Sequence, residues 1–260
     1  MAERLSIIKL QPKTVLQWSG FLGGSSADLL AAYPQAGLLS VELSDEAVLR
    51  SAAEHKRAWW QAWRRPMLEQ RRPESLKAAE AELLWANMAL HACADLPGTL
   101  QAWHRALSVE GFLMFSCLGP DSLVELRPIY ARMGWGEPMP QWRDMHDLGD
   151  MLVEAGFADP VMDQERLTLT WADAGALLAD LRALGGNLAP ARFKGWRGRQ
   201  WQAELSKELE CLRNPQGRLG LTVELVYGHA FKPPTRLKMS AQTQVSLDEM
   251  RNMVRQSRSK

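Results

Sequence analysis

Short apolar runs alternate with longer amphipathic stretches through the first half of the chain. The run GFLMFSCLG (111–119) is almost continuously apolar, as expected for a strand buried on both faces of a sheet. Apolar runs predict strands over residues 13–18, 37–43, 81–90 and 111–119. Periodic stretches predict helices over residues 25–34, 44–63 and 97–107, the first of them capped by Ser25 or Ser26. This rhythm indicates a parallel sheet flanked by helices, with ligands at the carboxyl ends of its strands.

The second half of the chain has a different pattern of hydrophobic and polar residues. Helical periodicity covers residues 145–157, 172–184 and 199–213, and alternating patterns predict strands over 160–171 and 219–231. The segment 64–74 is polar and interrupted by prolines, so the strand that would complete the sheet is hardly visible there. We expect one domain over residues 1–234 and a polar, basic, disordered tail over residues 235–260.

Composition narrows the functional classes. The 260 residues carry a formal net charge of +1, so no global field points to nucleic acid or a membrane surface. No apolar run approaches the roughly 20 residues that span a bilayer, and the N-terminus lacks a signal peptide's apolar core. The 3 cysteines share no CxxC spacing, which argues against a zinc site or a disulfide framework. We therefore expect a cytoplasmic protein without a structural metal.

A glycine-rich turn follows the first expected strand, in the stretch VLQWSGFLGGSS (15–26). Such turns let a nucleotide or nucleoside approach the backbone closely, because no Cβ stands in the way. Here Gln17, Ser19 and Phe21 occupy positions where a cofactor turn would have an acid and more glycine. The turn is open to two interpretations, a cofactor site or a purely structural connection.

Three later blocks carry a family resemblance that covers about residues 4 to 234. They are LLWANMALHACADLPGTLQAWHRALSVEGFLMFSCLGPDSLVELR (83–127), DMHDLGDMLVEAGFADPVMD (144–163) and LGLTVELVYGHAFKP (219–233). The first two resemble the malonyl-acyl-carrier-protein O-methyltransferases of biotin synthesis, and are similar to the related methyltransferase-like factors of respiratory complex I assembly. The third resembles the last strand of the biotin-synthesis group.

This resemblance implies a Rossmann-like class I methyltransferase fold. It implies a mostly parallel, seven-stranded sheet flanked by helices, with an antiparallel C-terminal strand. The implied cofactor is S-adenosylmethionine (SAM), and the implied reaction is methylation of the free carboxylate of a malonyl thioester on an acyl carrier protein. Methylation removes that charge, so that an apolar acyl-elongation machinery accepts the chain.

The glycine turn departs from the family pattern, which reads like VLDLGCGTG. Gln17 replaces the acid, whereas Ser19 and Phe21 replace glycines. Gly23 stays in register and Gly20 is displaced beside it, so these two are the expected cofactor contacts. A phenyl ring at position 21 would take space that the cofactor needs. The turn is therefore either a weakened SAM site or a structural turn that has lost SAM.

Further site residues are assigned by the resemblance. Glu42, at the end of the second strand, matches the acid that holds the ribose hydroxyls, and a carboxylate can accept both hydrogen bonds of a diol. Asn87 and His91 follow the strand in ANMALH, at the edge that faces the transferred methyl group. We assign Asn87 to the cofactor and His91 to the substrate. Glu69 is the nearest acid for the adenine pocket.

Arg127 is the favoured partner of the malonyl carboxylate. A guanidinium binds a carboxylate with two parallel hydrogen bonds, and the fold places this segment over the mouth of the site. The alternative is an ordinary surface arginine on a helix. No catalytic base is expected, because a carboxylate is already ionised and methyl transfer needs mainly in-line placement.

Two other clusters have plainer interpretations. Asp144, with the acids that follow it in WRDMHDLGD, is more typical of a helix cap than of a metal site. The Trp- and Arg-rich stretches 59–66 and 193–202 favour packing, with their arginines as a possible surface for an acidic carrier protein.

Three functional hypotheses remain. The first is an active SAM-dependent carboxyl methyltransferase. The second is a pseudo-methyltransferase that has lost SAM and acts as a partner or regulatory subunit. Only 14 residues precede VLQW, so a lid would be missing and the site would be open unless a protein partner covered it. The third, a nucleic-acid-binding module, is least favoured by the balanced charge.

Overall fold

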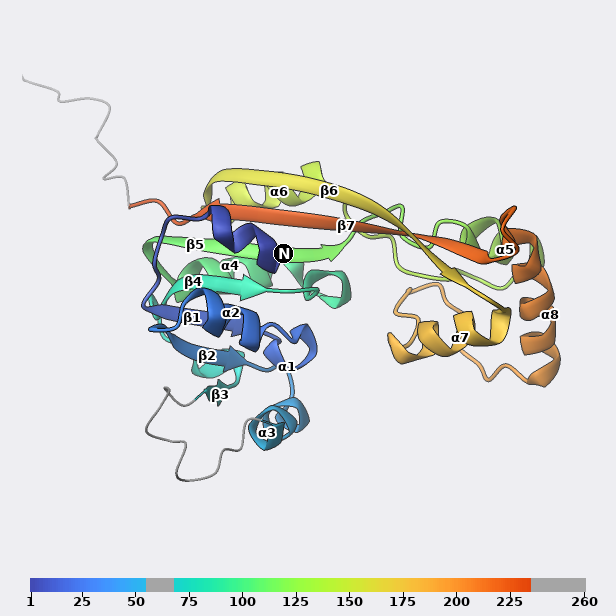
Figure 1. Ribbon diagram of the computed structural model, residues 1–260, viewed down its shortest axis with the longest axis horizontal. Coiled ribbons are helices and arrows are strands. Elements are labelled where there is room, and N and C mark those ends of the chain that lie inside the picture. Colours follow the sequence, from blue (N-terminus) through green and yellow to red (C-terminus); the bar gives the residue numbers. More distant parts are fainter. Residues whose placement is uncertain (55–67, 235–260) are drawn as a thin grey trace, which may run out of the picture.

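The computed structural model describes residues 1–54 and 68–234, which form a seven-stranded sheet with helices on both faces (Figure 1). The strand order is β3-β2-β1-β4-β5-β7-β6. The strands are β1 (Thr14–Trp18), β2 (Gly37–Val41), β3 (Glu69–Arg71), β4 (Ala81–Ala86), β5 (Leu107–Leu118), β6 (Ala158–Trp171) and β7 (Leu219–Phe231). Neighbours from β3 to β5 are parallel, whereas β7 runs antiparallel to β5 and β6. The expected topology, including the antiparallel C-terminal strand, is confirmed.

Helices connect and cover the strands. The α-helices are α1 (Gly20–Gly23), α2 (Ser26–Ala32), α3 (Asp45–Glu54), α4 (Leu96–Ala106), α5 (Leu126–Met133), α6 (Met145–Glu154), α7 (Ala174–Ala183) and α8 (Arg199–Leu209). Short 3₁₀ turns are η1 (Ala2–Ile7), η3 (Pro73–Ser75), η4 (Leu90–Ala92) and η5 (Glu210–Leu212). Within the described residues, no helix is both long and apolar enough to cross a membrane.

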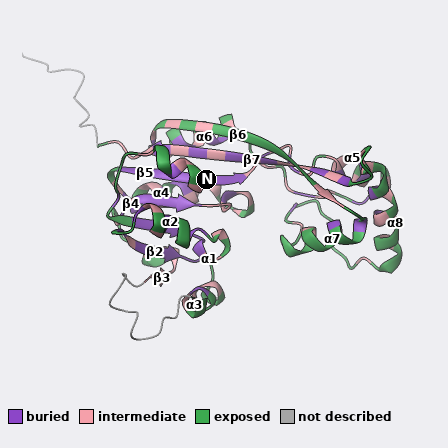
Figure 2. Cartoon of the chain, in the orientation of Figure 1, coloured by how far each residue is buried: buried purple, intermediate pink, exposed green. Residues whose placement is uncertain are grey.

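Alternate residues of the central strands build two cores, one on each face of the sheet. On β4, Leu84 and Ala86 pack with Trp103 of α4 and Leu152 of α6. The neighbouring β4 residues Leu83 and Trp85 belong to the opposite core, together with Leu29 of α2 and Leu5 of η1. β1, β4 and β5 are accordingly among the most buried elements of the described chain, whereas β6 is largely exposed (Figure 2). The continuous apolar runs follow from this two-sided burial.

A third core lies at the far end of the two longest strands. Beyond the central sheet, β6 and β7 continue as a twisted ribbon that ends among α5, α7 and α8 (Figure 1). Leu177 and Leu209 from these helices pack with Leu219 and Leu221 of β7. We call α5, α7, α8 and these strand ends the helical lobe. The boundary at residue 234 stays a prediction, and residues 235–260 lie outside the described part.

Three sequence expectations need correction. The proline-interrupted segment contains β3, whose polar residues pair with β2 and whose Arg71 bonds to Glu69 and Glu80. Helix α5 has no counterpart among the expected elements. Ser25 precedes α2 but does not cap it, because its hydroxyl donates to the Gly23 carbonyl instead. The expected helix 44–63 is confirmed up to Glu54, and its remainder lies outside the described residues.

Candidate functional site

The glycine turn forms a single helical turn, α1, between β1 and α2. Ser19 precedes it with a left-handed backbone, at φ 54° and ψ 45°. This conformation costs a residue with a Cβ roughly 1–2 kcal/mol, and glycine adopts it freely. Ser19 therefore adopts a conformation that suits glycine, the residue that the family pattern has at this position.

Close packing explains two of the glycines in this turn. A Cβ on Gly20 would lie 2.4 Å from Ser40 Oγ on β2, so the turn or the Ser40 side chain would have to move. A Cβ on Gly23 would lie 3.2 Å from the Asn87 carbonyl oxygen past the end of β4. Gly20 and Gly23 thus allow α1 to pack closely at the carboxyl ends of β2 and β4, the strands on either side of β1. Their contact with a cofactor stays a prediction.

Asn87 fastens the turn to the sheet. Its Nδ2 donates to the Gly23 carbonyl over 2.8 Å, and its Oδ1 accepts from Ser116 Oγ of β5 over 2.8 Å. Ser116 Oγ in turn accepts from the Met88 backbone N–H. Asn87, which was expected to contact the cofactor, therefore holds the glycine turn against the ends of β4 and β5.

Gln17 has taken a structural role in place of the family's acid. It is buried at the end of β1, beside the N-terminus of α2. In the amide orientation that satisfies both of its polar atoms, its nitrogen donates to Ser26 Oγ over 2.8 Å and its oxygen accepts from the Ser25 and Ser26 amides over 3.2 Å. Gln17 thereby supplies the capping acceptor that Ser25 does not.

Glu42 carries a buried carboxylate oxygen with no partner. The side chain is 1% exposed, directly after β2. Its Oε1 accepts from the Phe21 backbone N–H over 2.9 Å and from Ser40 Oγ over 2.7 Å. Its Oε2 is buried and has no hydrogen-bond donor in the described chain. One oxygen, rather than both, is therefore available to a ligand hydroxyl, and the residues fit a ribose contact of this kind.

Two other cofactor expectations fare differently. Phe21 is half-buried at the start of α1 and holds Glu42 through its backbone, whereas exclusion of the cofactor by its ring stays a prediction. Glu69 begins β3 instead of following it, and Arg71 binds both of its carboxylate oxygens, at 2.7 and 2.8 Å. The expected position of Glu69 beyond the third strand is therefore wrong, and Glu74 is the first acid beyond β3.

A cavity of about 810 Å³ opens beyond the carboxyl ends of β4 and β5. From the sheet side it is lined by residues including Leu90, His91, Cys117 and Leu118. Residues after α5 and α7, including Glu137, Trp142, Leu188 and Pro190, line it from the other side. His91 follows Asn87 by four positions, so the cavity begins close to the glycine turn. This is the geometry expected of an acceptor pocket beside a cofactor site.

His91 is a neutral hydrogen-bonding group in the wall of this cavity. Its carbonyl accepts from Trp142 Nε1 over 3.0 Å, which ties the two sides of the cavity together. Its Nδ1 is buried and has no partner within the described chain. Burial lowers the pKa of the imidazole below its usual value, since desolvation disfavours the charged form. His91 can therefore contact an acceptor without carrying charge.

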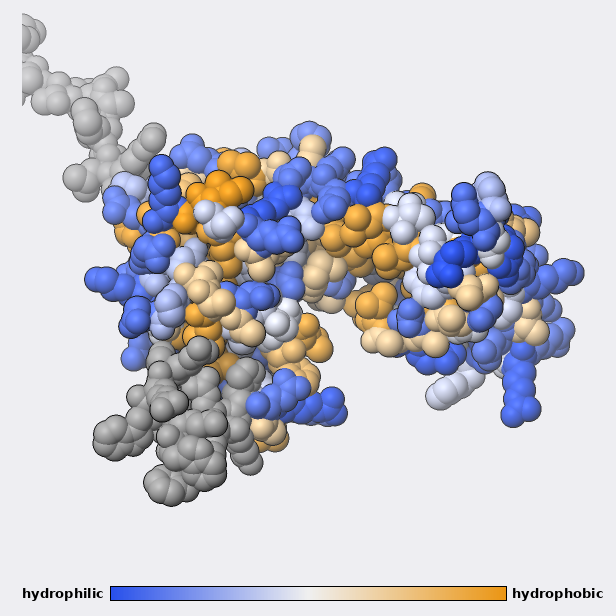
Figure 3. All heavy atoms as spheres, viewed as in Figure 1, coloured by the Kyte–Doolittle hydropathy of each residue, from blue (hydrophilic) through white to orange (hydrophobic). Residues whose placement is uncertain are grey.

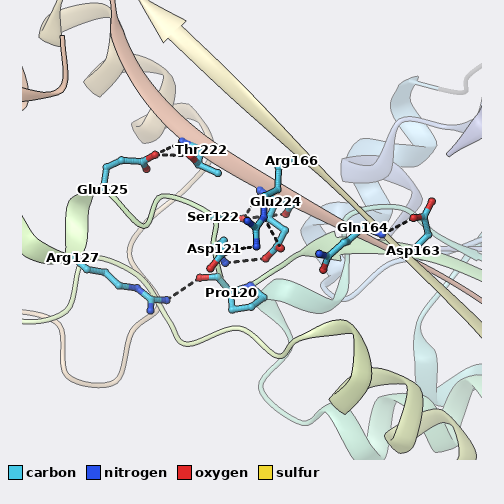
Figure 4. Close-up of polar contacts among 10 residues, drawn as sticks. All are labelled: Pro120, Asp121, Ser122, Glu125, Arg127, Asp163, Gln164, Arg166, Thr222 and Glu224. Atoms are coloured by element: carbon cyan, nitrogen blue, oxygen red, sulfur yellow. Dashed lines mark hydrogen bonds and ion pairs between the residues drawn. The ribbon is translucent and has the colours of Figure 1, made fainter. Parts of the chain in front are cut away.

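The favoured arginine, Arg127, does not line the cavity that contains His91. Arg127, in the first turn of α5, is half-buried and donates to the Pro120 carbonyl over 3.1 Å (Figure 4). No carboxylate in the described ranges pairs with it, and it is not among the residues that line the cavity. Sequence reasoning missed Arg143, an exposed guanidinium that does line the cavity. Its position just before α6 gives no signal of this in the sequence.

A buried acid fixes the segment that leads to Arg127. Glu224 of β7 is 2% exposed and accepts from the Asp121 backbone N–H over 2.9 Å. Its carboxylate also faces Arg166 of β6, which forms an ion pair with Asp121 (Figure 4). Ser122 exchanges hydrogen bonds with the backbone of Glu224. The loop between β5 and α5 is thus held in one position over the sheet end.

The remaining clusters follow the plainer interpretation where they can be described. Asp144 accepts from the backbone N–H groups of His146 and Asp147, each over 2.8 Å, and caps α6 as expected. In the second Trp- and Arg-rich stretch, Arg197 stacks on Trp201 and Phe193, with 4.4 Å to each ring centre. The first stretch, 59–66, lies outside the described residues.

Known sequences resemble nearly the whole described chain. It is 40% identical over 243 residues to a malonyl-[acyl-carrier protein] O-methyltransferase of Gallionella capsiferriformans, covering 91% of this chain and 83% of that protein. A protein of the same name from a Methylovorus strain is 36% identical over 243 residues, covering 92% and 82%. No family model matches the chain.

Solved structures share the fold at much lower identity. The YcgJ protein of Bacillus subtilis superposes with a TM-score of 0.61 at 10% identity, covering 89% of this chain and 97% of that one. Phosphoethanolamine N-methyltransferase 2 of Haemonchus contortus, solved with S-adenosylhomocysteine, gives 0.52 at 11% identity and covers 89% and 51%. The chain therefore has a class I methyltransferase fold, the fold in which such enzymes use SAM.

Proposed function

Because the chain belongs to the family of malonyl-[acyl-carrier protein] O-methyltransferases, we propose that it methylates the free carboxylate of a malonyl thioester on an acyl carrier protein, with SAM as the methyl donor. The observation that carries the proposal is the buried, unpartnered Oε2 of Glu42 beside the glycine turn. A buried charged oxygen without a donor is costly, and a ligand hydroxyl would satisfy it.

Residues at the glycine turn would hold the cofactor. Glu42 Oε2 would accept a hydrogen bond from the ribose, and Asn87 would hold the Gly23 turn against the sheet. When bound, SAM supplies an electrophilic methyl group. The new bond would form between a malonyl carboxylate oxygen and that methyl carbon, and the electron pair of the broken carbon–sulfur bond would stay on sulfur. The products are a methyl ester and S-adenosylhomocysteine.

No protein base is needed for this reaction, and the cavity fits that requirement. The acceptor carboxylate is ionised at neutral pH, so the chain has to orient it and exclude water. Burial favours the neutral form of His91, so its imidazole can form a hydrogen bond in the cavity without placing a positive charge beside the malonyl carboxylate. Cys117 and Leu118 give the cavity an apolar floor suited to the rest of an acyl arm.

Two arginines are candidates for the acceptor carboxylate. Arg143 lines the cavity and keeps only a 3.9 Å contact with Asp147. Arg127, the choice from the sequence, has a guanidinium bonded to a single carbonyl. The cavity lining favours Arg143. Replacement of the carboxylate-binding arginine by alanine should raise the KM for the malonyl substrate at least tenfold, and replacement of the other should not.

The non-catalytic alternative has no comparable support. The part of its basis that lies in the turn is Gln17, Ser19 and Phe21, which depart from the family pattern. Ser19 has a left-handed backbone conformation that suits glycine. Gln17 stands where the family has an acid, and its side-chain oxygen accepts hydrogen bonds from the Ser25 and Ser26 amides at the start of α2. These substitutions preserve the turn on which a cofactor would rest. The aromatic ring at position 21 is the remaining argument for weakened SAM affinity.

The proposal is tested by binding and by turnover. Titration calorimetry with S-adenosylhomocysteine should give a micromolar Kd, and methyl-labelled SAM should transfer its label to malonyl-acyl carrier protein. The Glu42→Gln variant should lose most of both signals. A wild-type chain that binds neither SAM nor its product would overturn the proposal and favour the non-catalytic alternative.

A further inference from the structure

One segment of the helical lobe concentrates positive charge. Residues 181–203 contain five basic residues and no Asp or Glu, in a chain whose net charge is only +1. The five are Arg182, Arg192, Lys194, Arg197 and Arg199. Within the described ranges, none of them forms an ion pair. Their charge is therefore not neutralised by the chain itself.

The same segment exposes large apolar side chains. Trp196 is fully exposed, and Leu184, Leu188 and Phe193 are each more than half exposed. Apolar side chains reach the surface of the helical lobe at its edge toward the central sheet (Figure 3). Exposed apolar groups among unpaired cations are typical of a protein-binding surface, because tryptophan and arginine dominate the energetics of such interfaces.

Specific contacts hold this segment in place. Arg197 stacks between Phe193 and Trp201, and its guanidinium donates to the Trp135 carbonyl over 2.5 Å. Asn187 Nδ2 donates to the Glu137 carbonyl over 2.6 Å. These contacts anchor both ends of the segment on residues 135–137. A pre-arranged surface loses less entropy when a partner binds.

The segment also forms part of the acceptor cavity. Leu188, Pro190 and Ala191 line it, across from His91 and Cys93. The exposed cations Arg192, Lys194 and Arg199 follow these lining residues in the chain. The rim of the cavity and the basic surface are therefore one continuous stretch of backbone.

We propose that residues 184–199, the basic rim, form the docking surface for an acidic acyl carrier protein, oriented so that its acyl arm enters the cavity beside Leu188. The inference rests on the proposed function and adds to it the place where the partner binds. Unpaired cations attract an acidic protein surface and speed its association. Trp196 supplies the apolar anchor, and the adjoining cavity receives the arm.

The direct test is binding of a holo-acyl carrier protein to the whole chain, measured by biolayer interferometry without SAM. The variant with both Lys194→Glu and Arg199→Glu should bind at least tenfold more weakly, and Trp196→Ala should also weaken binding. Lys9→Glu with Lys207→Glu, which makes the same charge change at exposed positions elsewhere, should bind like the wild type. Wild-type binding should weaken with added salt.

Equal binding by all variants, or no binding by the wild type, would overturn the docking surface. A DNA or RNA oligonucleotide that competes with the carrier provides a second test. If it binds Lys9→Glu/Lys207→Glu but not Lys194→Glu/Arg199→Glu, the basic rim binds nucleic acid, and the proposed docking surface is overturned as well.

Turnover separates this inference from the proposed function. Methylation of malonyl-pantetheine, which lacks the protein, should proceed equally in the wild type and in Lys194→Glu/Arg199→Glu, whereas KM for malonyl-acyl carrier protein should rise in the variant alone. A chain that binds the carrier through the basic rim yet methylates neither substrate would keep the docking surface and lose the proposed function. A chain that methylates malonyl-pantetheine but binds the carrier at another surface would keep the proposed function and overturn the docking surface.

Discussion

The side chain of Asn87 donates to the carbonyl of Gly23 over 2.8 Å and so joins the end of β4 to the turn after β1. The same amide accepts from Ser116 of β5. Three neighbouring strands are thereby coupled to the backbone on which a cofactor would lie. The conformation of the turn depends on this amide as well as on its glycines.

Asn87→Asp should loosen the turn while leaving its other contact intact. An aspartate retains an acceptor for Ser116 but places a carboxylate oxygen against the Gly23 carbonyl. We expect the free energy of unfolding to fall by about 1–3 kcal/mol and the Kd for S-adenosylhomocysteine to rise about tenfold. Urea titration and calorimetry measure the two effects.

Asn214→Asp is the matched control for that experiment. Asn214 uses only its side-chain oxygen, which accepts from the amides of Gln216 and Arg218. Aspartate preserves both bonds, so neither stability nor ligand binding should change appreciably. An Asn87→Asp variant that behaves like this control would show that the amide contact does not support the turn.

Glu42→Gln should separate folding from ligand binding. Neutralising a buried carboxylate whose second oxygen has no partner removes a desolvation cost, so the ligand-free protein should melt at the same temperature or higher. Loss of a charge-assisted hydrogen bond should weaken S-adenosylhomocysteine binding by about tenfold to a hundredfold. The thermal shift produced by saturating ligand measures this difference. The exposed Glu46→Gln is the control, and an equal ligand shift in both variants would contradict the ribose assignment.

Ser19→Gly should stabilise the protein although it removes a side chain. The left-handed backbone at position 19 costs serine roughly 1–2 kcal/mol, which glycine would not lose. The greater conformational freedom of glycine in the unfolded chain offsets about half of this stabilisation. We expect a net increase of about 0.5–1 kcal/mol in the free energy of unfolding, measured by urea titration. Ser25→Gly, at φ −95° and with a bonded hydroxyl, should instead destabilise. A stability loss in both variants would contradict the strain at Ser19.

The strands of the central sheet were predictable because burial on both faces leaves a strong apolar signal, as in β5. β3 was not, since its three polar residues are ordered by pairing with β2 and by the Arg71 contacts with Glu69 and Glu80. Nor could sequence place Leu188 opposite His91, because nearly a hundred residues separate the two walls of the cavity. Glu42 was assigned from the family resemblance at the end of the second strand, but its single free oxygen depends on tertiary contacts.

Cys117 should resist alkylation until the protein unfolds. Burial raises the pKa of its thiol to about 12, so almost none of the reactive thiolate exists at pH 8. Cys211 is exposed and should react readily under the same conditions. Iodoacetamide labelling followed by peptide mass spectrometry distinguishes the two sites. Labelling of Cys117 in the folded chain at a rate near that of Cys211 would mean that the cavity wall opens to solvent.

Protonation of His91 should destabilise the fold in mildly acidic solution. Burial lowers the pKa of His91 below its ordinary 6.5, so the unfolded chain takes up the proton first as the pH falls. The neutral imidazole's contribution is therefore complete above pH 6.5 and is lost as the pH falls toward the lowered pKa.

Urea unfolding at successive pH values should show this loss directly, and His91→Gln should reduce the slope of stability against pH in that window. His104 and His229 also have pKa values lowered by burial, so part of the slope should remain in the variant. His146, which is exposed, serves as the control through His146→Gln. If His91→Gln and His146→Gln leave identical pH profiles, the imidazole of His91 is not the buried neutral group that the cavity wall requires.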